Sequence, residues 1–352
     1  MEENDLIIKK SDRILVTGST GFIGTRLVNA LLQNGFRHLC CFVRHSSDLT
    51  TLSDVLNKNN ATVEMMEGDL LNPSDCHQAV AGVSVIFHLA AGRGEKSYPS
   101  AFLNSVVTTK NILLACMTDT SLRRFLNVSS FVVYSNQSLK HNEILDEKCP
   151  MEKRPVARGD AYCYAKVRQD EIVIEYGAKH HIPFSIVRPG FVYGPGNMSM
   201  TGRVGIGTFG LFLHLGGSNI IPFTYVDNCA DAIALVGLTK GCDAEVFNIV
   251  DDNLPTSRKF LRLYKKNTGG FSSLYLPRPM SFFLCYLWEK YSDWSKGQLP
   301  PVFNRNRWSA EWKGNRYSNK KLKQLTGWKP RISFDEALRR YFEYFRNARR
   351  AK

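Results

Sequence analysis

One segment constrains the fold more than any other: RILVTGSTGFIGTRLVNALLQNG, which covers residues 13–35. A short apolar strand leads into a turn that contains Gly18, Gly21 and Gly24, and an amphipathic helix follows. Glycines let the backbone turn sharply and approach a pyrophosphate, while the start of the helix offers free N–H groups and partial positive charge. Glycines alone also mark ordinary turns, but their place between strand and helix predicts a dinucleotide-binding turn.

The rest of the first half repeats an alternation of strand and helix. Helix-like segments separate further apolar strands, which we expect at residues 38–43, 62–66, 83–89 and 124–128. This alternation predicts an α/β fold with a doubly wound, parallel sheet of the Rossmann type. In such a sheet the ligand binds at the carboxyl ends of the strands.

Composition narrows the class of protein. The 352 residues are 43% apolar and 22% charged, as in an ordinary soluble globular protein. No apolar run approaches the roughly 20 residues of a spanning helix, so we expect no integral membrane segment. The start lacks the pattern of a secretory signal, and the nine cysteines lack metal-ligand spacing. We therefore expect a cytoplasmic protein with free thiols and no metal site.

The formal net charge of +14 suits nucleic acid, an anionic membrane surface or an anionic cofactor. Much of the charge lies near the C-terminus, for example in NRYSNKKLKQL at residues 315–325. Apolar residues recur there at helical intervals, so the lysines form a solvated face. Since no recognised nucleic-acid motif accompanies the charge, we expect a small-molecule substrate and no nucleic-acid partner.

Candidate cofactor contacts fall at the strand ends. Asp69 and Leu70, in GDL, follow the third strand, where a carboxylate can meet the adenine edge. Ala90 and Ala91, in HLAAG, place small side chains beside the cofactor. The residues between the glycines of the turn belong to the same predicted site: Thr20, Phe22 and Ile23.

The second strand bears on the choice of cofactor. An NAD site usually has an acidic residue after this strand, for the ribose hydroxyls. Here the strand runs into Arg44, and a guanidinium fits a 2′-phosphate. We therefore expect NADP rather than NAD, with stacking of Arg44 on the adenine, or exposure to solvent, as the alternative.

The stretch GDAYCYAKVRQ, residues 159–169, predicts the chemistry. Tyr162 and Lys166 are four residues apart and share a helix face, whereas Tyr164 points away. A free phenol has a pKa of about 10, which a nearby ammonium and the nicotinamide charge lower. Tyr162 is thus predicted to exchange a proton with a substrate hydroxyl while the nicotinamide exchanges hydride with the same carbon, and Lys166 also holds the ribose. The alternative is chance spacing, with the tyrosine buried and the lysine solvated.

Taken together, the ordered motifs resemble the extended short-chain dehydrogenase/reductase superfamily over nearly the whole chain. They are TGSTGFIG, GDL, HLAA, VSSFVVYS, YCYAK, RPGFVYGPG, YVDNCADA and LTGWKPRISFDEALRRYFEY. The resemblance implies that Ser130, with Ser129 as the fallback, hydrogen-bonds the substrate oxygen. It also implies that Asn104 lies on a helix beside the active site and that Pro189 borders the nicotinamide.

The same resemblance implies a division of the chain. Residues 1–196 are expected to form the NAD(P)-binding Rossmann domain, and residues 222–250 to return to it. Residues 197–352 are expected to form mainly a smaller lobe that covers the substrate, together with the C-terminal helices. A homodimer is a further expectation at the level of the superfamily.

Three functions stay open. Many nucleotide-sugar epimerases and dehydratases of the superfamily carry an Arg–Asp pair where this chain reads IIPFTYVDN, without charge until Asp227. That departure, and the aromatic stretch at residues 276–294, look more like the 3β-hydroxysteroid dehydrogenase branch, which favours an apolar secondary alcohol or ketone. The alternatives are a UDP-glucose 4-epimerase-like enzyme that retains NAD tightly, and a non-catalytic nucleotide sensor. The aromatic stretch also suits a core, a dimer surface or a membrane-surface contact.

Overall fold

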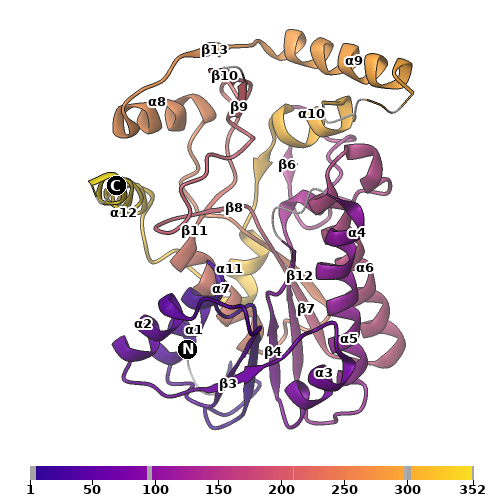
Figure 1. Cartoon of the computed structure of the whole chain (residues 1–352), viewed down its shortest axis with the longest axis vertical. Helices are drawn as coiled ribbons and strands as arrows, with labels where there is room; N and C mark the ends of the chain where they lie inside the picture. The colour runs from indigo at the N-terminus through magenta and orange to yellow at the C-terminus, as the bar shows by residue number, and fades with distance from the viewer. Residues whose placement is uncertain (1–4, 93–96, 209, 297, 299–302, 351–352) are drawn as a thin grey trace.

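The structure is a computed structural model that describes residues 5–92, 97–208, 210–296, 298 and 303–350 (Figure 1). Its centre is a parallel seven-stranded sheet in the order β12-β7-β5-β4-β1-β2-β3. The strands span, in that order, Glu245–Ile249, Phe184–Pro189, Arg124–Val128, Val85–His88, Ile14–Thr17, Leu39–Val43 and Glu64–Glu67. The direction of strand addition reverses between β1 and β4, as in the Rossmann fold. The predicted fold class is confirmed.

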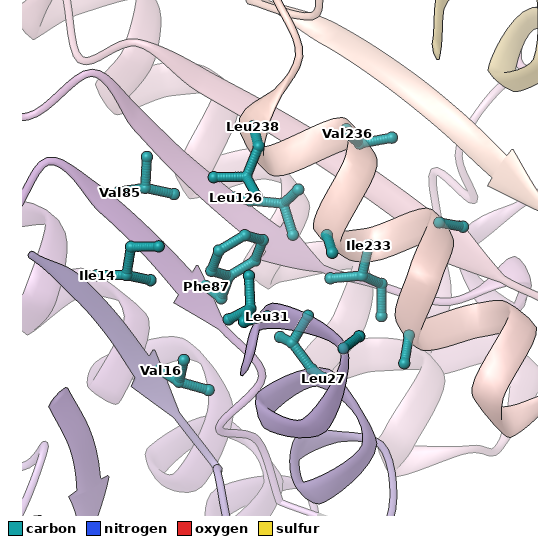
Figure 2. Close-up of a cluster of buried hydrophobic side chains, with 14 of the residues drawn as sticks. Ile14, Val16, Leu27, Leu31, Val85, Phe87, Leu126, Ile233, Val236 and Leu238 are labelled. Atoms are coloured by element: carbon teal, nitrogen blue, oxygen red, sulfur yellow. The ribbon is translucent and has the colours of Figure 1, made fainter. Parts of the chain in front are cut away.

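Two hydrophobic cores lie on opposite faces of the sheet because successive side chains of a strand alternate in direction. Ile14 and Val16 of β1 belong to the first core, whereas Leu15 belongs to the second. Helices α1 (Gly24–Gln33), α2 (Thr50–Lys58) and α7 (Val226–Leu238) cover the first face. Figure 2 shows its centre, where Phe87 of β4 packs among side chains from α1 and α7.

The second face is covered by α3 (Pro73–Val80), α5 (Thr108–Cys116) and α6 (Ala161–His180). Because helices cover both faces, the strands read as nearly continuous apolar runs: β1, β2, β4, β5 and β7 are buried at every position. This is why the strands could be located from the sequence.

Above the carboxyl ends of the strands, mainly the second half of the chain forms smaller elements, which β6 of the first half joins by pairing with β14 (Figure 1). Its core gathers aromatic side chains, including Tyr193, Phe223, Phe260 and Tyr341. The strands here are β6 (Ile144–Leu145), β8 (Phe191–Tyr193), β9 (Gly205–Thr208), β10 (Leu211–His214), β11 (Phe223–Tyr225), β13 (Ser273–Tyr275) and β14 (Arg316–Tyr317). The helices are α8 (Ser257–Thr268), α9 (Arg278–Trp294), α10 (Arg305–Trp312), α11 (Lys320–Thr326) and α12 (Phe334–Arg350).

The second half of the chain also returns to the central sheet. After β11 it forms α7 on the first face of the central sheet and then β12, which pairs in parallel with β7. Within the residues that the structure describes, no helix is both long enough and apolar enough to cross a membrane.

Candidate active site

The glycine turn lies between β1 and α1, and its geometry requires glycine at two positions. Gly18 has φ +70°, and a Cβ added there would lie 3.0 Å from the backbone nitrogen of Ala90. A Cβ on Gly24 would lie only 2.0 Å from the carbonyl oxygen of Gly18. The turn is therefore pressed between the end of β4 and the first turn of α1, which is the close packing that a dinucleotide cradle needs.

The N-terminus of α1 also fits an anion. Its N-cap is Ile23, no side chain caps it, and its first turn holds no acidic residue. In contrast, Asp160 caps α6, Thr256 caps α8 and Asn304 caps α10 through side-chain oxygens. Because no side chain caps α1, the positive end of its dipole is open to a pyrophosphate.

Gly24→Ala is expected to weaken dinucleotide binding at least tenfold and to lower the melting temperature, because the new methyl group collides with the carbonyl of Gly18. The measurements are calorimetric titration with NADH and NADPH and a thermal melt. Gly207→Ala is the matched control, since a Cβ at Gly207 meets nothing within 4 Å. Equal affinities for the two variants would contradict the assignment of the turn.

The other predicted cofactor residues follow neighbouring strands, so parallel pairing brings them to one edge of the sheet. Arg44 is exposed after β2. Asp69 is exposed after β3, where its Oδ1 accepts the N–H of Leu71 at 2.9 Å. Leu70 is buried, whereas the two alanines after β4 are partly buried. The remaining predicted positions are placed as follows: Thr20, Phe22 and Ile23 are partly buried in the turn, Gly21 is exposed there, Ala90 and Ala91 follow β4, and Pro189 ends β7.

Helix α6 carries the predicted tyrosine and lysine. Asp160 caps the helix by accepting the N–H of Tyr162 at 3.0 Å, so Tyr162 lies in the first turn, where it is partly buried. Lys166, one turn later, is 4% exposed, and its Nζ donates to the carbonyl oxygen of Val128 and to Oε1 of Gln169, each at 2.8 Å. Burial lowers the pKa of Lys166 to about 8, and Asp170 opposes that shift. The alternative of a solvated lysine is wrong.

The predicted serine lies at the end of β5. Ser130 is partly buried and caps a 3₁₀ helix, η3 (Phe131–Val133), by accepting the N–H of Val132 at 3.3 Å. This bond uses an oxygen lone pair and leaves the hydroxyl proton available for donation. Ser129, the fallback, is buried. Tyr164 packs edge-on against Tyr98, with ring centroids 5.3 Å apart, which agrees with its predicted direction away from the site.

A buried hydrogen-bond chain behind Lys166 was not predicted. Gln169 accepts from Lys166 and donates through Nε2 to Oγ1 of Thr109 at 2.7 Å. Thr109 in turn donates to the carbonyl oxygen of Ser105 at 2.6 Å. Gln169 follows Lys166 by three positions, so the helical spacing that identified the lysine could also have identified the glutamine.

The chain continues through His88, the last residue of β4. Its Nε2 lies 2.8 Å from Oγ1 of Thr109, and its Nδ1 lies 2.9 Å from Oγ1 of Thr17. Because Thr109 donates to Ser105, it accepts from His88, which places the imidazole proton on Nε2. Thr17 then donates to Nδ1 and accepts the N–H of Ala90 at 3.2 Å. Neutral His88 thus links the hydrogen bonds of Lys166 to the backbone of Ala90, a predicted cofactor residue.

The free energy of unfolding is expected to fall as the pH drops below 6.5. Burial, assisted by the charge of Lys166, lowers the pKa of His88 from 6.5 to about 3. Between these values the unfolded chain binds a proton that the folded protein does not, so stability is complete above 6.5 and is lost progressively towards 3. At pH 5 this amounts to about 2 kcal/mol. Urea unfolding at pH 7 and pH 5 measures the free energy that each protein loses between the two values. The loss should be about 2 kcal/mol smaller in His88→Gln than in the wild type. An equal loss in the two proteins would show that His88 does not cause it.

A second buried group lies beside the lysine. Asp170 is fully buried and accepts from Nε of Arg188 at 3.1 Å and from Nδ2 of Asn127 at 3.0 Å. Nη2 of Arg188 lies 3.0 Å from the same carboxylate, so the two side chains form an ion pair. The guanidinium of Arg188 also lies 4.6 Å from the ring centroid of Tyr134. Burial raises the pKa of Asp170, and the charge of Arg188 opposes that rise. This ion pair joins α6 to β7 below the predicted site.

Asn104 lies in a π-helical segment, η2 (Phe102–Val107), between α4 (Tyr98–Ala101) and α5. The segment packs against α6. Single π-helical turns within α-helices often occur at functional sites. Asn104 therefore lies on a helical segment beside α6, and its place beside the active site and its role stay predictions.

A cavity of about 720 Å³ lies apart from all these residues. It opens over the outer side of α1 and is bounded by α2, α7 and α12. Neither the glycines of the turn nor the residues of the Ser130, Tyr162 and Lys166 group line it. The candidate active site therefore rests on the geometry of the turn and of α6, and not on this cavity.

Comparison with known proteins bears on the enzyme class. Residues 14–249 match the sequence profile of the NAD dependent epimerase/dehydratase family. The chain belongs to this family. The predicted resemblance to extended short-chain dehydrogenases/reductases is confirmed, and so is the prediction of an enzyme with NAD-dependent oxidoreductase or epimerase chemistry.

Individual relatives of this chain have low sequence identity to it but are similar to it in length. The chain is 24% identical to the mouse (Mus musculus) sterol-4-alpha-carboxylate 3-dehydrogenase, decarboxylating, over 98% of this chain and 94% of the relative. It is 25% identical to 2-alkyl-3-oxoalkanoate reductase of Stenotrophomonas maltophilia, over 93% and 98%. The fold is similar to UDP-glucuronic acid 4-epimerase from Bacillus cereus, solved with UDP-glucuronic acid and NAD, with a TM-score of 0.70, 21% identity and coverage of 96% and 99%.

Proposed function

We propose that this enzyme catalyses NAD(P)-dependent hydride transfer at an apolar secondary alcohol or ketone, with Ser130, Tyr162 and Lys166 as its catalytic residues. The observation that carries the proposal is the buried ammonium of Lys166. It is held one helical turn from Tyr162, against the carbonyl of Val128 at the end of the strand that leads to Ser130.

Each residue has a distinct role in this proposal. When bound, the nicotinamide supplies the hydride exchange. Tyr162 exchanges the proton of the substrate hydroxyl, and Ser130 donates a hydrogen bond to the same oxygen. Lys166 is mainly protonated at pH 7, and two of its three N–H donors go to Val128 and Gln169. Its charge favours the phenolate of Tyr162, and its third donor can hold a ribose hydroxyl.

The expected preference for NADP rests on Arg44, which is exposed after β2 in place of the acidic residue of NAD sites. Arg44→Glu is expected to weaken NADPH binding at least tenfold and to leave NADH binding unchanged or stronger, since only NADPH carries the 2′-phosphate. Calorimetric titration with both dinucleotides measures the ratio. Arg37→Glu, an exposed site before β2, is the control. Equal effects of the two variants would leave NAD as the cofactor.

The substrate class rests on the second half of the chain. Strand β11, which occupies the position where many nucleotide-sugar enzymes carry charge, consists of buried Phe223, Thr224 and Tyr225. The relatives named as sterol and oxoalkanoate enzymes extend over nearly the whole chain and support an apolar substrate. We propose that residues 1–196, with 222–250, bind the dinucleotide and that the remainder of residues 197–352 covers this substrate.

The second candidate is a nucleotide-sugar epimerase, which the family and the similarity to the Bacillus cereus epimerase fold favour. One experiment separates the candidates. The purified protein is analysed for bound small molecules by mass spectrometry and then assayed, by the absorbance of reduced nicotinamide, with apolar secondary alcohols and ketones and with nucleotide sugars.

Net turnover of an apolar alcohol or ketone, with loosely held cofactor, is the expected result. Retained NAD together with conversion of a nucleotide sugar, without net redox change, would overturn it in favour of the epimerase. Dinucleotide binding without turnover of any compound in either panel would instead indicate a sensor on the same fold.

A further inference from the structure

Helix α9 presents its large apolar side chains to solvent. Counting about 100° per residue, Met280, Phe283, Leu284, Leu287, Tyr291 and Trp294 fall within an arc of about 100° on the helix. All six are exposed: Phe283 is 56% exposed and Trp294 is 76% exposed. A helix of a soluble protein normally directs such an arc towards the core.

The opposite side of α9, which faces the protein, buries small side chains instead of large apolar ones. Its buried residues are Ser281, Cys285 and Ser292, which are small. Oγ of Ser281 accepts the indole N–H of Trp308, from α10, at 2.9 Å. Phe282 also packs on Trp308, with ring centroids 5.0 Å apart. Among the described residues, α9 is thus held against α10 by Phe282 and by small side chains, and the six residues of the apolar arc stay exposed.

The apolar surface extends beyond the helix. Strand β13, which leads into α9, exposes Leu274 and Tyr275, and Phe271 precedes it. Figure 1 shows α8, β13 and α9 along the end of the molecule that is farthest from the central sheet. We call this the α9 surface. Its exposed large apolar residues are Phe271, Leu274, Tyr275, Met280, Phe282, Phe283, Leu284, Leu287, Tyr291 and Trp294.

The same end is basic. Between residues 257 and 296 the chain has eight basic residues and two acidic ones. Helix α8 carries five of the basic residues and no acidic residue: Arg258, Lys259, Arg262, Lys265 and Lys266. One of the two acidic residues, Glu289, is paired with Arg305. The positive charge of this end is therefore largely unopposed.

We propose that the α9 surface docks on an anionic lipid bilayer, with α9 in the plane of the headgroups. Exposed tryptophan, tyrosine, phenylalanine and leucine side chains are those that enter the interface, and flanking lysine and arginine attract anionic headgroups. A second copy of the chain is the other occupant that such a surface could take. Pairing two identical, strongly basic ends is opposed by like charge, whereas an anionic surface complements them.

The test is co-sedimentation of the full chain with large unilamellar vesicles, either neutral phosphatidylcholine or phosphatidylcholine with about one third phosphatidylserine. We expect at least tenfold stronger partition onto the anionic vesicles. Leu284→Asp combined with Leu287→Asp should reduce it at least tenfold, because both residues enter the apolar layer. The control is Leu114→Asp combined with Met117→Asp, two similarly exposed apolar residues at the end of α5.

Charge is tested separately. Arg262→Gln combined with Lys266→Gln should weaken binding to anionic vesicles severalfold, whereas Lys110→Gln combined with Lys179→Gln should not. Unchanged dinucleotide affinity and circular dichroism show that each variant is folded. Failure of the wild type to bind, equal binding to neutral vesicles, or an equal loss in the control variants would overturn the proposal. So would a dimer in analytical ultracentrifugation that the Leu284 and Leu287 changes abolish without any effect on vesicle binding.

Discussion

Tyr162→Phe is expected to lower kcat by about 10²–10⁴-fold and to leave dinucleotide affinity unchanged. The substitution removes the hydroxyl that exchanges the substrate proton, and general acid–base catalysis contributes about that factor. It keeps the aromatic ring, and the cap of α6 is unaffected because Asp160 binds the backbone N–H of residue 162. The lysine below keeps its two partners, Val128 and Gln169.

Two measurements decide this prediction: steady-state turnover of whichever substrate the panel identifies, and calorimetric titration with the dinucleotide. Tyr164→Phe is the matched control, two residues along the same helix, where the ring packs against Tyr98 and Phe102. Near-normal turnover of the Tyr162 variant would reject the catalytic assignment. A parallel loss of dinucleotide binding would assign the residue to cofactor binding or to folding.

Asp170→Ala is expected to lower the free energy of unfolding by about 3–5 kcal/mol, because it leaves a buried cation without its counter-ion. Arg188 is 3% exposed and directs two of its nitrogens at this carboxylate. The amide of Asn127 would lose its acceptor as well. Loss of the negative charge would also lower the pKa of Lys166 further, since Asp170 is the group that raises it.

Urea unfolding measures the effect, and the adjacent residue of α6 supplies the control. Glu171 pairs with Arg168 at the surface, where both side chains are more than one third exposed, so Glu171→Ala should cost less than about 1 kcal/mol. Asp170→Asn, which keeps the shape and one acceptor oxygen, should fall between the two. Similar losses for Asp170→Ala and Glu171→Ala would show that the buried pair does not stabilise the fold.

The sequence predicted those parts of the fold and the candidate site that depend on short-range pattern. Strand and helix alternation located the parallel strands because both faces of this sheet are covered and the strands are apolar throughout. The glycine turn and the spacing of Tyr162 and Lys166 were visible because a turn and a helix face are each specified within a few residues. Whether Ser130, Tyr162 and Lys166 act together stays a prediction that the variants above test.

Other features could not be predicted, since they join residues that are distant in the chain. The hydrogen-bond chain from Lys166 to Ala90 passes through Thr109, His88 and Thr17, on separate strands and helices. A histidine or threonine in an apolar segment has no local signal that names its partner. Burial then decides the protonation state of each group, because removal from water disfavours the charged form. A buried polar group without a hydrogen-bond partner also costs free energy, so each group needs one.

The sequence by itself determined the kind of sheet, the place of the dinucleotide turn and the helix face that carries the tyrosine and the lysine, because periodicity and backbone freedom act locally. Only the tertiary structure decided that Lys166 is buried, that Asp170 pairs with Arg188, and that the apolar arc of α9 faces outwards. The amphipathic pattern of a helix shows that it has two sides. Which side meets solvent depends on what packs against it, and for α9 that is α10, whose Trp308 contacts Ser281 and Phe282.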